Sequence, residues 1–267
     1  MRNIFITIFL FTYGIATCQQ ETVIPKLFIN QNVTTHFIMS EPITYVDISI
    51  HSIRGDQPEA NILRVRPIKQ DKSKDLQQGI ITIVCQSYMV QYQLVEGTIK
   101  ETTKYIRLKS SDGVGILNKD ITITTPQMKA LCLKVLEEKA TYNTVKSTKN
   151  KLQLKLNNIF TIGDYFFIDL LVTNKTNIKY DIDQIRFKIE DKKKVKRTNN
   201  QDVEIYEVFK LYDVSDFKKR YRNIFVFDKF TFPDEKVFTI ELAEEQVSGR
   251  MLKLDIDYID VLNADTL

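Results

Sequence analysis

The segment from Thr124 to Lys139, TTPQMKALCLKVLEEK, constrains the fold most, because no other long segment after the N-terminal leader has a helical period. Thr124 or Thr125 can cap its first turn, and Pro126 then stands where a missing N–H costs nothing. The apolar residues recur at helical spacing and share one face: Met128, Leu131, Cys132, Val135 and Leu136. We therefore predict a linker helix over residues 124–140 whose apolar face packs on a neighbouring sheet.

On both sides of this segment, apolar and polar residues alternate with a period of two, which is typical of strands. Residues 28–118 contain roughly five or six short alternating runs, which favour a small antiparallel sandwich or barrel. Residues 149–267 contain about seven longer runs with turns between them, which match an immunoglobulin-like sandwich. The Cys…Trp…Cys core of antibody domains is absent, since the chain has no Trp. The expected fold is mainly β, with two β-sandwich domains joined by one helix.

Two glycine-containing segments are predicted to be turns. The first is RGDQPEAN, residues 54–61, whose RGD is a three-residue match with a high chance rate and is not interpreted as an adhesion motif. The second is Gly113-Val114-Gly115, which lacks the third glycine and the following helix of a nucleotide-binding fingerprint.

The first twenty residues, MRNIFITIFLFTYGIATCQQ, have the pattern of a secretory signal peptide. Arg2 forms a short basic region, and the apolar run that follows is shorter than a membrane span. We predict a signal peptide over residues 1–18, export to the periplasm, and cleavage that leaves Cys18 or Gln19 at the new N-terminus. The run Ile15-Ala16-Thr17-Cys18 also approximates a bacterial lipobox, so lipidation of Cys18 is the alternative to simple cleavage.

Composition and net charge exclude few classes of protein. The net charge of +4 is too small to predict nucleic-acid binding, and the low counts of Gly and Pro argue against disorder. After removal of the leader, Cys85 and Cys132 remain, and one pair is permitted in an oxidising compartment. Each lies in an apolar stretch, so we interpret both first as small buried residues and leave their pairing open.

No catalytic constellation is evident. The chain has two histidines, His36 and His51, and neither belongs to a zinc-binding pattern. Nucleophile-elbow and phosphate-loop motifs are absent, so we predict a protein that is not an enzyme and that needs no cofactor or metal. Asp255 and Asp257 share one face of a strand. They could act as paired acids or bind calcium, but a solvated strand face is the favoured interpretation.

Candidate partner-binding residues lie in the second half of the chain. Arg186 and Arg250 could anchor carboxylates of a partner, or form rim salt bridges of little consequence. Phe225 and Phe227 lie in the run from Tyr221 to Phe232, YRNIFVFDKFTF, which is apolar on both faces. Such a strand is buried either within its own domain, the favoured interpretation, or partly against a partner.

Two basic runs are also candidates for contact with anionic lipid or a partner: Lys192–Arg197 at the tip of an expected hairpin, and Lys218–Arg222. A solvated surface is the favoured interpretation of both.

Several long blocks carry a resemblance to a known family. They include VTTHFIMSEPITYVDIS in the first half, and FTIGDYFFIDLLVTNKTNIKYDIDQIRFKIEDKKKVKRTN and YRNIFVFDKFTFPDEKVFTIELAEEQVSGR in the second. The chain resembles the TraN proteins of Bacteroides conjugative transposons from Val33 to Asp265. TraN is an exported component of the mating apparatus, a type IV secretion system that carries DNA between cells. A remoter similarity, to the TrbG/CagX group, implies a role in an outer-membrane core complex.

The resemblance implies a structural subunit at the periplasmic side of the outer membrane. Its partners would be other mating-apparatus proteins and copies of itself within a ring, without sequence-specific contact to nucleic acid. The family supplies no catalytic residues. The alternative is a surface-exposed lipoprotein that binds a glycan or a protein, and a cell-envelope hydrolase is the weakest of the three hypotheses.

Overall fold

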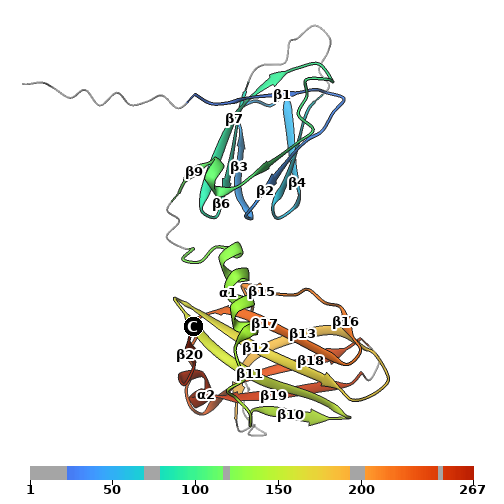
Figure 1. The fold of residues 1–267 in the computed structure, drawn as a ribbon, viewed down its shortest axis with the longest axis vertical. Coiled ribbons are helices and arrows are strands. Elements are labelled where there is room, and N and C mark those ends of the chain that lie inside the picture. Colours follow the sequence, from blue (N-terminus) through green and yellow to red (C-terminus); the bar gives the residue numbers. More distant parts are fainter. Residues whose placement is uncertain (1–22, 69–78, 117–120, 193–201, 246–248) are drawn as a thin grey trace, which may run out of the picture.

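The computed structural model describes residues 23–68, 79–116, 121–192, 202–245 and 249–267. The expected signal peptide with Cys18, the polar connection at residues 69–78 and all but the first residue of the basic run 192–197 lie outside these ranges. The described chain is mainly β, as predicted. Figure 1 shows two β lobes along the long axis of the molecule, with the main helix on the side of the second lobe that faces the first.

The N-terminal lobe is a sandwich of two sheets. One has the order β1-β7-β6-β3 with β9 beside β7, and the other has the order β4-β5-β2-β8. A single apolar core lies between them, to which all strands but the two-residue β9 contribute. The strands are β1 (Lys26–Ile29), β2 (Thr35–Met39), β3 (Ile43–Ile48), β4 (Ile53–Glu59), β5 (Ile62–Pro67), β6 (Gly79–Cys85), β7 (Tyr88–Glu96), β8 (Tyr105–Leu108) and β9 (Val114–Gly115).

This sandwich differs from the sequence prediction in three respects. It is not wholly antiparallel, because β1 pairs with β7 and β2 with β8 in parallel. The RGD segment, expected to be a turn, lies in β4, where Asp56 stands opposite Arg64 and binds it. Gly113 bends the chain at the end of a 3-10 turn (Ser110–Asp112), but Val114 and Gly115, also expected in a turn, form β9. A Cβ on Gly113 would lie 2.6 Å from the Met89 carbonyl oxygen, so only glycine fits.

The C-terminal lobe is a second sandwich, and its strand order is that of the predicted immunoglobulin-like fold. One sheet contains β11-β12-β17 and the other β19-β18-β13, the arrangement of strands A-B-E and G-F-C in that fold. The strands are β10 (Lys146–Lys149), β11 (Leu152–Ile162), β12 (Tyr165–Asn174), β13 (Tyr180–Asp191), β14 (Val203–Ile205), β15 (Phe209–Lys210), β16 (Asp216–Phe217), β17 (Arg220–Asp228), β18 (Lys236–Glu244), β19 (Met251–Asp257) and β20 (Asp265–Thr266).

Helix α1 (Thr125–Glu137) covers the outer face of the first of these sheets. Thr124 is its capping residue, one of the two that the sequence offered, and Gln127 completes a capping box, with Oε1 accepting the backbone N–H of Thr124 at 2.8 Å. The predicted apolar face is confirmed, because all five of its residues pack against β12, β15 and β17 in one cluster. The helix is therefore a third layer of the C-terminal sandwich, which goes beyond its expected role as a linker.

A buried charge holds the end of α1 to this sheet. Asp169 on β12 has no exposed surface, and its carboxylate accepts two hydrogen bonds from Arg222 of β17, at 3.0 and 2.6 Å. Asn157, at a β-bulge in β11, and Asn158, directly after it, donate to the same carboxylate. Arg222 also donates to the Leu136 carbonyl oxygen at 3.1 Å, so the guanidinium links sheet and helix. The expected basic surface Lys218–Arg222 thus lacks the charge of its last residue, which is neutralised inside the domain.

A second, shorter helix follows β19. It is α2 (Tyr258–Leu262), which begins after the capping residue Asp257 and was not predicted from the sequence. Tyr142 Oη donates to the Asp260 carbonyl oxygen at 2.8 Å and fixes this turn against the start of the sandwich. No helix in the described part of the chain is long and apolar enough to cross a membrane.

Candidate interaction cleft

The outer edge of β13 is open in its middle. On this edge β16 pairs with β13 at Tyr180 and Asp181, and β14 pairs with it from Phe187 to Ile189. Between these two short partners, residues 183–186 have no strand beside them within the described ranges, while β18 occupies the opposite edge. An unpaired stretch flanked by paired ones is a template for another strand.

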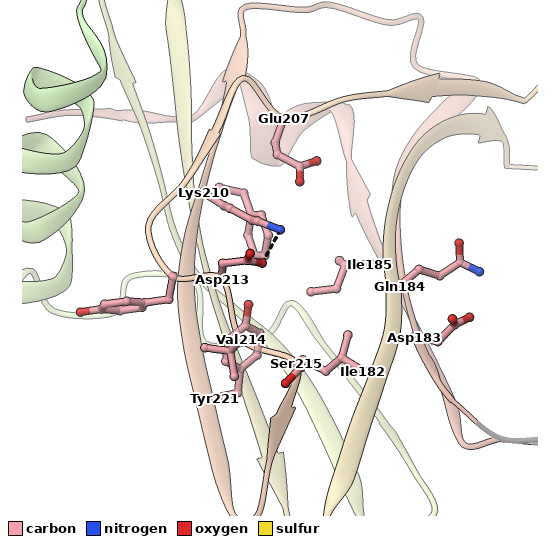
Figure 2. Close-up of a pocket in the computed structure, with 12 residues that line it drawn as sticks. Ile182, Asp183, Gln184, Ile185, Glu207, Lys210, Asp213, Val214, Ser215 and Tyr221 are labelled. Atoms are coloured by element: carbon pink, nitrogen blue, oxygen red, sulfur yellow. Dashed lines mark ion pairs between the residues drawn. The ribbon is translucent and has the colours of Figure 1, made fainter. Parts of the chain in front are cut away.

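A cleft of about 460 Å³ opens beside this stretch, between β13 and the segment that leads from β15 to β16. A β-bulge between Ile182 and Gln184 changes which face the residues point to. Figure 2 shows Ile182 and Ile185 both reaching from β13 into the cleft, with Asp183 and Gln184 on the other side of the strand. The floor is formed by Tyr221 and Phe225 of β17. Strand addition here would therefore place side chains against an apolar base.

The wall opposite β13 carries charged groups beside the apolar side chain of Val214. Lys210 and Asp213 form an ion pair at 2.8 Å across the turn after β15, as Figure 2 shows. The hydrogen bond from Lys210 lowers the pKa of the Asp213 carboxyl, so that group stays ionised near neutral pH. Glu207 adds a second carboxylate at the upper end of the cleft (Figure 2). The wall can therefore form hydrogen bonds with an incoming polar backbone.

The segment that forms this wall is held by a buried amide. Asn223 on β17 has no exposed surface; its Oδ1 accepts the N–H of Tyr212 at 3.0 Å and its Nδ2 donates to the Tyr212 carbonyl oxygen at 2.9 Å. It thereby imitates the backbone of a neighbouring strand. Ser215 then contacts the other sheet, where its carbonyl oxygen accepts the N–H of Ile182 at 2.8 Å. The cleft is a defined space because its wall is bonded to both sheets.

Exposed apolar side chains are concentrated on the chain that runs from β14 to the wall of the cleft. Within twelve residues, five large apolar side chains remain exposed: Val203, Tyr206, Val208, Tyr212 and Val214. Tyr206 is 72% exposed and Val208 is 46% exposed, and they flank Glu207 of the cleft. A group of this kind at the edge of a sandwich is typical of a protein–protein contact.

Residues 124–266 match the family described as a domain of unknown function, DUF4138. The match covers more than half of the chain. The chain belongs to the DUF4138 family. Comparison with curated proteins gives no match. The DUF4138 region begins at the capping residue of α1 and takes in the whole C-terminal sandwich, so the cleft lies within it.

The prediction that Phe225 and Phe227 bind a partner is wrong in the DUF4138 sandwich. Phe225 is 2% exposed and Phe227 is fully buried, and both rings pack against Phe187 of the other sheet. On the other face of β17, Ile224 and Val226 lie beneath α1. The strand is apolar on both faces because each face is covered within the domain, which was the favoured interpretation.

The two candidate arginines lie in different surroundings. Arg250 binds Glu244 with two guanidinium nitrogens, donates to Thr176 and to the Lys179 carbonyl oxygen, and stands over the Tyr180 ring. Glu244 raises the pKa of the Arg250 guanidinium through this hydrogen bond. Arg250 thus forms a salt bridge inside the domain, which was the other interpretation of this residue, and its role in partner binding stays a prediction.

Arg186, by contrast, is exposed and ends the open stretch of β13. Its Nε donates to Gln184 on the same strand at 2.7 Å. Its role in partner binding stays a prediction, and the structure places it beside the cleft.

Asp255 and Asp257 share an exposed face of β19, as expected. Lys253 lies 3.4 Å from Asp255, and Lys192 lies 2.9 Å from Asp257. Each carboxylate therefore lies beside an ammonium group, which Asp255 shares with Glu190 and Asp257 shares with Asp234. Within the described residues, no group of three or more His, Cys, Asp or Glu side chains could hold a metal ion.

The two described cysteines are separate and buried, one in each lobe. Burial raises the pKa of the Cys85 thiol to about 11 and that of Cys132 to about 12. Both are packing residues, as the sequence suggested, and they do not pair in this structure. His36 lies on β2 with its Nδ1 3.3 Å from the Lys104 carbonyl oxygen, while His51 is exposed in a turn.

The cleft itself was not predicted from the sequence. Its one available signal was the run VEIYEVFKLYDV, in which apolar residues recur without a matching buried face. The gap in β13 has no sequence signature, because it depends on where β14 and β16 end.

Proposed function

We propose that this protein is a structural subunit of a conjugative transfer apparatus, exported to the periplasm and assembled at the inner side of the outer membrane. The resemblance of long sequence blocks to TraN proteins supports the proposal. Within such an assembly, the cleft beside β13 is the contact site for another subunit.

The observation that carries the contact is the open stretch of β13 at residues 183–186. A neighbouring subunit adds a strand there, because the backbone groups on that edge need partners and the cleft floor provides apolar contact. Tyr206 and Val208 at the rim then lose their exposed surface. Buried aromatic residues at the centre of an interface usually carry much of its free energy.

The test is a pair of charged substitutions at the rim, Tyr206→Glu with Val208→Glu. Both side chains are exposed, so the domain should fold and melt as the wild type does. Each charge would be buried without a partner in the interface, so co-purification of the other mating-apparatus proteins from donor cells should fall by about tenfold or more. The frequency of DNA transfer should fall with it.

The chain offers a matched control, Tyr45→Glu with Val114→Glu. These are also an exposed tyrosine and an exposed valine, but they lie on the N-terminal sandwich. The control should keep both co-purification and transfer. A rim variant that folds, keeps every partner and transfers DNA at the wild-type frequency would rule out the cleft as an assembly contact.

The alternative, a lipoprotein that binds a glycan or a protein at the cell surface, would use the same opening. A volume of about 460 Å³ with carboxylate and ammonium groups on one wall is also compatible with a short glycan. In that case the rim variant should transfer DNA normally and lose binding to a polysaccharide or an external protein. The two hypotheses therefore predict opposite results for transfer frequency.

A further inference from the structure

A basic face lies on the N-terminal sandwich, outside the region that matches DUF4138. Arg54 of β4 and Arg66 of β5 stand directly opposite each other in the strand register, and both are exposed. Neither forms a hydrogen bond or an ion pair within the described chain. Like charges directly opposite each other destabilise a sheet. Within the described residues, the Asp56 carboxylate attracts both guanidinium groups, but it is one negative charge beside the three positive charges of Arg54, Arg64 and Arg66.

A hollow of about 350 Å³ lies over this pair. The adjacent row of the same face contributes Asp56, Arg64 and His36, which stand opposite one another on β4, β5 and β2. A second hollow of about 300 Å³, lined by Gln31 and Pro67 among others, borders the two arginines on the other side. The arginine pair is therefore accessible from two openings in a rigid sheet.

The charge of the hollow is unbalanced. Asp56 binds Arg64 through Nε at 3.0 Å and through a second guanidinium nitrogen. That hydrogen bond lowers the pKa of the Asp56 carboxyl, so it stays ionised and neutralises Arg64. The charges of Arg54 and Arg66 are left over. A doubly charged anion would match them.

We propose that this hollow binds a phosphate-bearing group between the guanidinium groups of Arg54 and Arg66. Guanidinium presents paired N–H donors whose spacing matches two phosphate oxygens, and such bonds are among the strongest in proteins. A phosphate monoester carries close to two negative charges near neutral pH, whereas a carboxylate carries one. Thr34, at the rim of the hollow, supplies a hydroxyl donor.

A single-stranded nucleic acid fits this face less well. Binding of that kind relies on successive aromatic side chains on which bases stack. Within the described residues of this face, Tyr105 opposite His36 is the exposed aromatic side chain, and it lies outside the lining of the hollow. The phosphate group therefore belongs either to a soluble molecule or to the headgroup of a phosphomonoester lipid.

The test uses the purified protein and the double variant Arg54→Gln with Arg66→Gln. Inorganic phosphate, titrated at constant ionic strength, should bind the wild type at millimolar concentrations and raise its melting temperature. The double variant should bind it at least about tenfold more weakly, because two charged hydrogen-bond donors are lost. In phosphate-free buffer the variant should melt no lower than the wild type, since the opposed charges are gone.

The matched control is Arg107→Gln with Arg220→Gln, which removes the same charge from two exposed arginines outside the hollow. It should bind phosphate within about twofold of the wild type. Sedimentation with phosphatidylcholine vesicles that contain phosphatidic acid or, at equal charge, phosphatidylserine separates the two sources. Binding to phosphatidic acid that depends on Arg54 and Arg66 assigns a lipid headgroup, and binding to inorganic phosphate alone assigns a soluble phosphate.

Two results would overturn the proposal. One is a wild type that binds neither inorganic phosphate nor phosphatidic acid vesicles. The other is an equal loss of binding in the double variant and the control, which would show a general effect of net charge. The cleft on the C-terminal sandwich is untouched by these variants, so the result is independent of the proposed assembly role.

Discussion

The two sandwiches of this chain treat the outer faces of their sheets differently. In the N-terminal sandwich, the sheet β4-β5-β2-β8 has its inner face in the core and an outer face of exposed arginines. In the C-terminal sandwich, α1 covers the outer face of the sheet that contains β17. In the strands of the N-terminal sheet, apolar and polar residues therefore alternate. In β17 of the C-terminal sheet, apolar residues occupy consecutive positions. A strand that is apolar at consecutive positions therefore indicates a third layer within its own domain as readily as it indicates a partner protein.

The ion pairs of the two sandwiches differ in the same way, one being exposed and the other covered. The Asp56–Arg64 pair of the N-terminal sandwich stands in solvent, with both side chains about half exposed. The Asp169–Arg222 pair of the C-terminal sandwich has a carboxylate with no exposed surface, because α1 and the sheet enclose it. The first pair can exchange with water when broken, whereas the second leaves a charge in the protein interior.

The largest expected effect is that of Phe227→Glu. The substitution places a carboxylate among Phe187, Phe230 and Phe238, at a cost on the order of 5 kcal/mol or more, which equals the net stability of an ordinary domain. Calorimetry should show that the transition of the C-terminal sandwich is lost while that of the N-terminal sandwich remains. Tyr45→Glu, on an exposed face of β3, should leave both transitions in place. A normal melting curve for Phe227→Glu would mean that this ring is not in the core.

An intermediate effect is expected from Arg222→Ala. Asp169 keeps its two asparagine donors but loses the guanidinium, so the C-terminal sandwich should lose about 3 kcal/mol in urea unfolding. Arg64→Ala breaks the exposed pair of the other sandwich and should leave the urea midpoint unchanged. Equal effects of the two substitutions would contradict the distinction between the lobes.

The smallest effect should come from the start of α1. Thr124→Ala removes one half of the capping box and should cost about 1 kcal/mol of stability in the C-terminal sandwich alone. Thr122→Ala is the control, since Thr122 is exposed just before the helix begins. The midpoint of urea unfolding measures both variants. A shift in the transition of the N-terminal sandwich would show that α1 stabilises both lobes. That result would contradict the assignment of α1 to the C-terminal sandwich alone.

Much of the architecture could be predicted from the sequence because the signals are local. Met128, Cys132 and Val135 share a face by helical geometry alone, whatever they pack against. The strands of the C-terminal lobe were recognised by alternation and by their turns. The count and spacing of these strands favoured the immunoglobulin-like fold, whose order then rests on pairs that are distant in sequence, β12 with β17 and β13 with β18. The shorter strands β1 and β9 and the helix α2 were missed, because a few residues carry too little pattern to identify an element.

The candidate sites were less predictable, because each depends on contacts between distant residues. Phe225 and Phe227 could be core or interface until α1 and the opposite sheet were known to cover the two faces of β17. Arg250 is near Thr176 and Lys179 only because β18 and β19 fold back beside the start of β13.

By itself, then, the sequence determined where the helix and the main strands lie and which of their faces are apolar, since those properties repeat over neighbouring residues. Only the tertiary structure decided that residues 183–186 lack a partner strand and that Arg54 stands opposite Arg66. Both features arise from strand register and from the lengths of neighbouring strands. Register and strand length are set by packing across the whole sheet, so they cannot be predicted from any single segment.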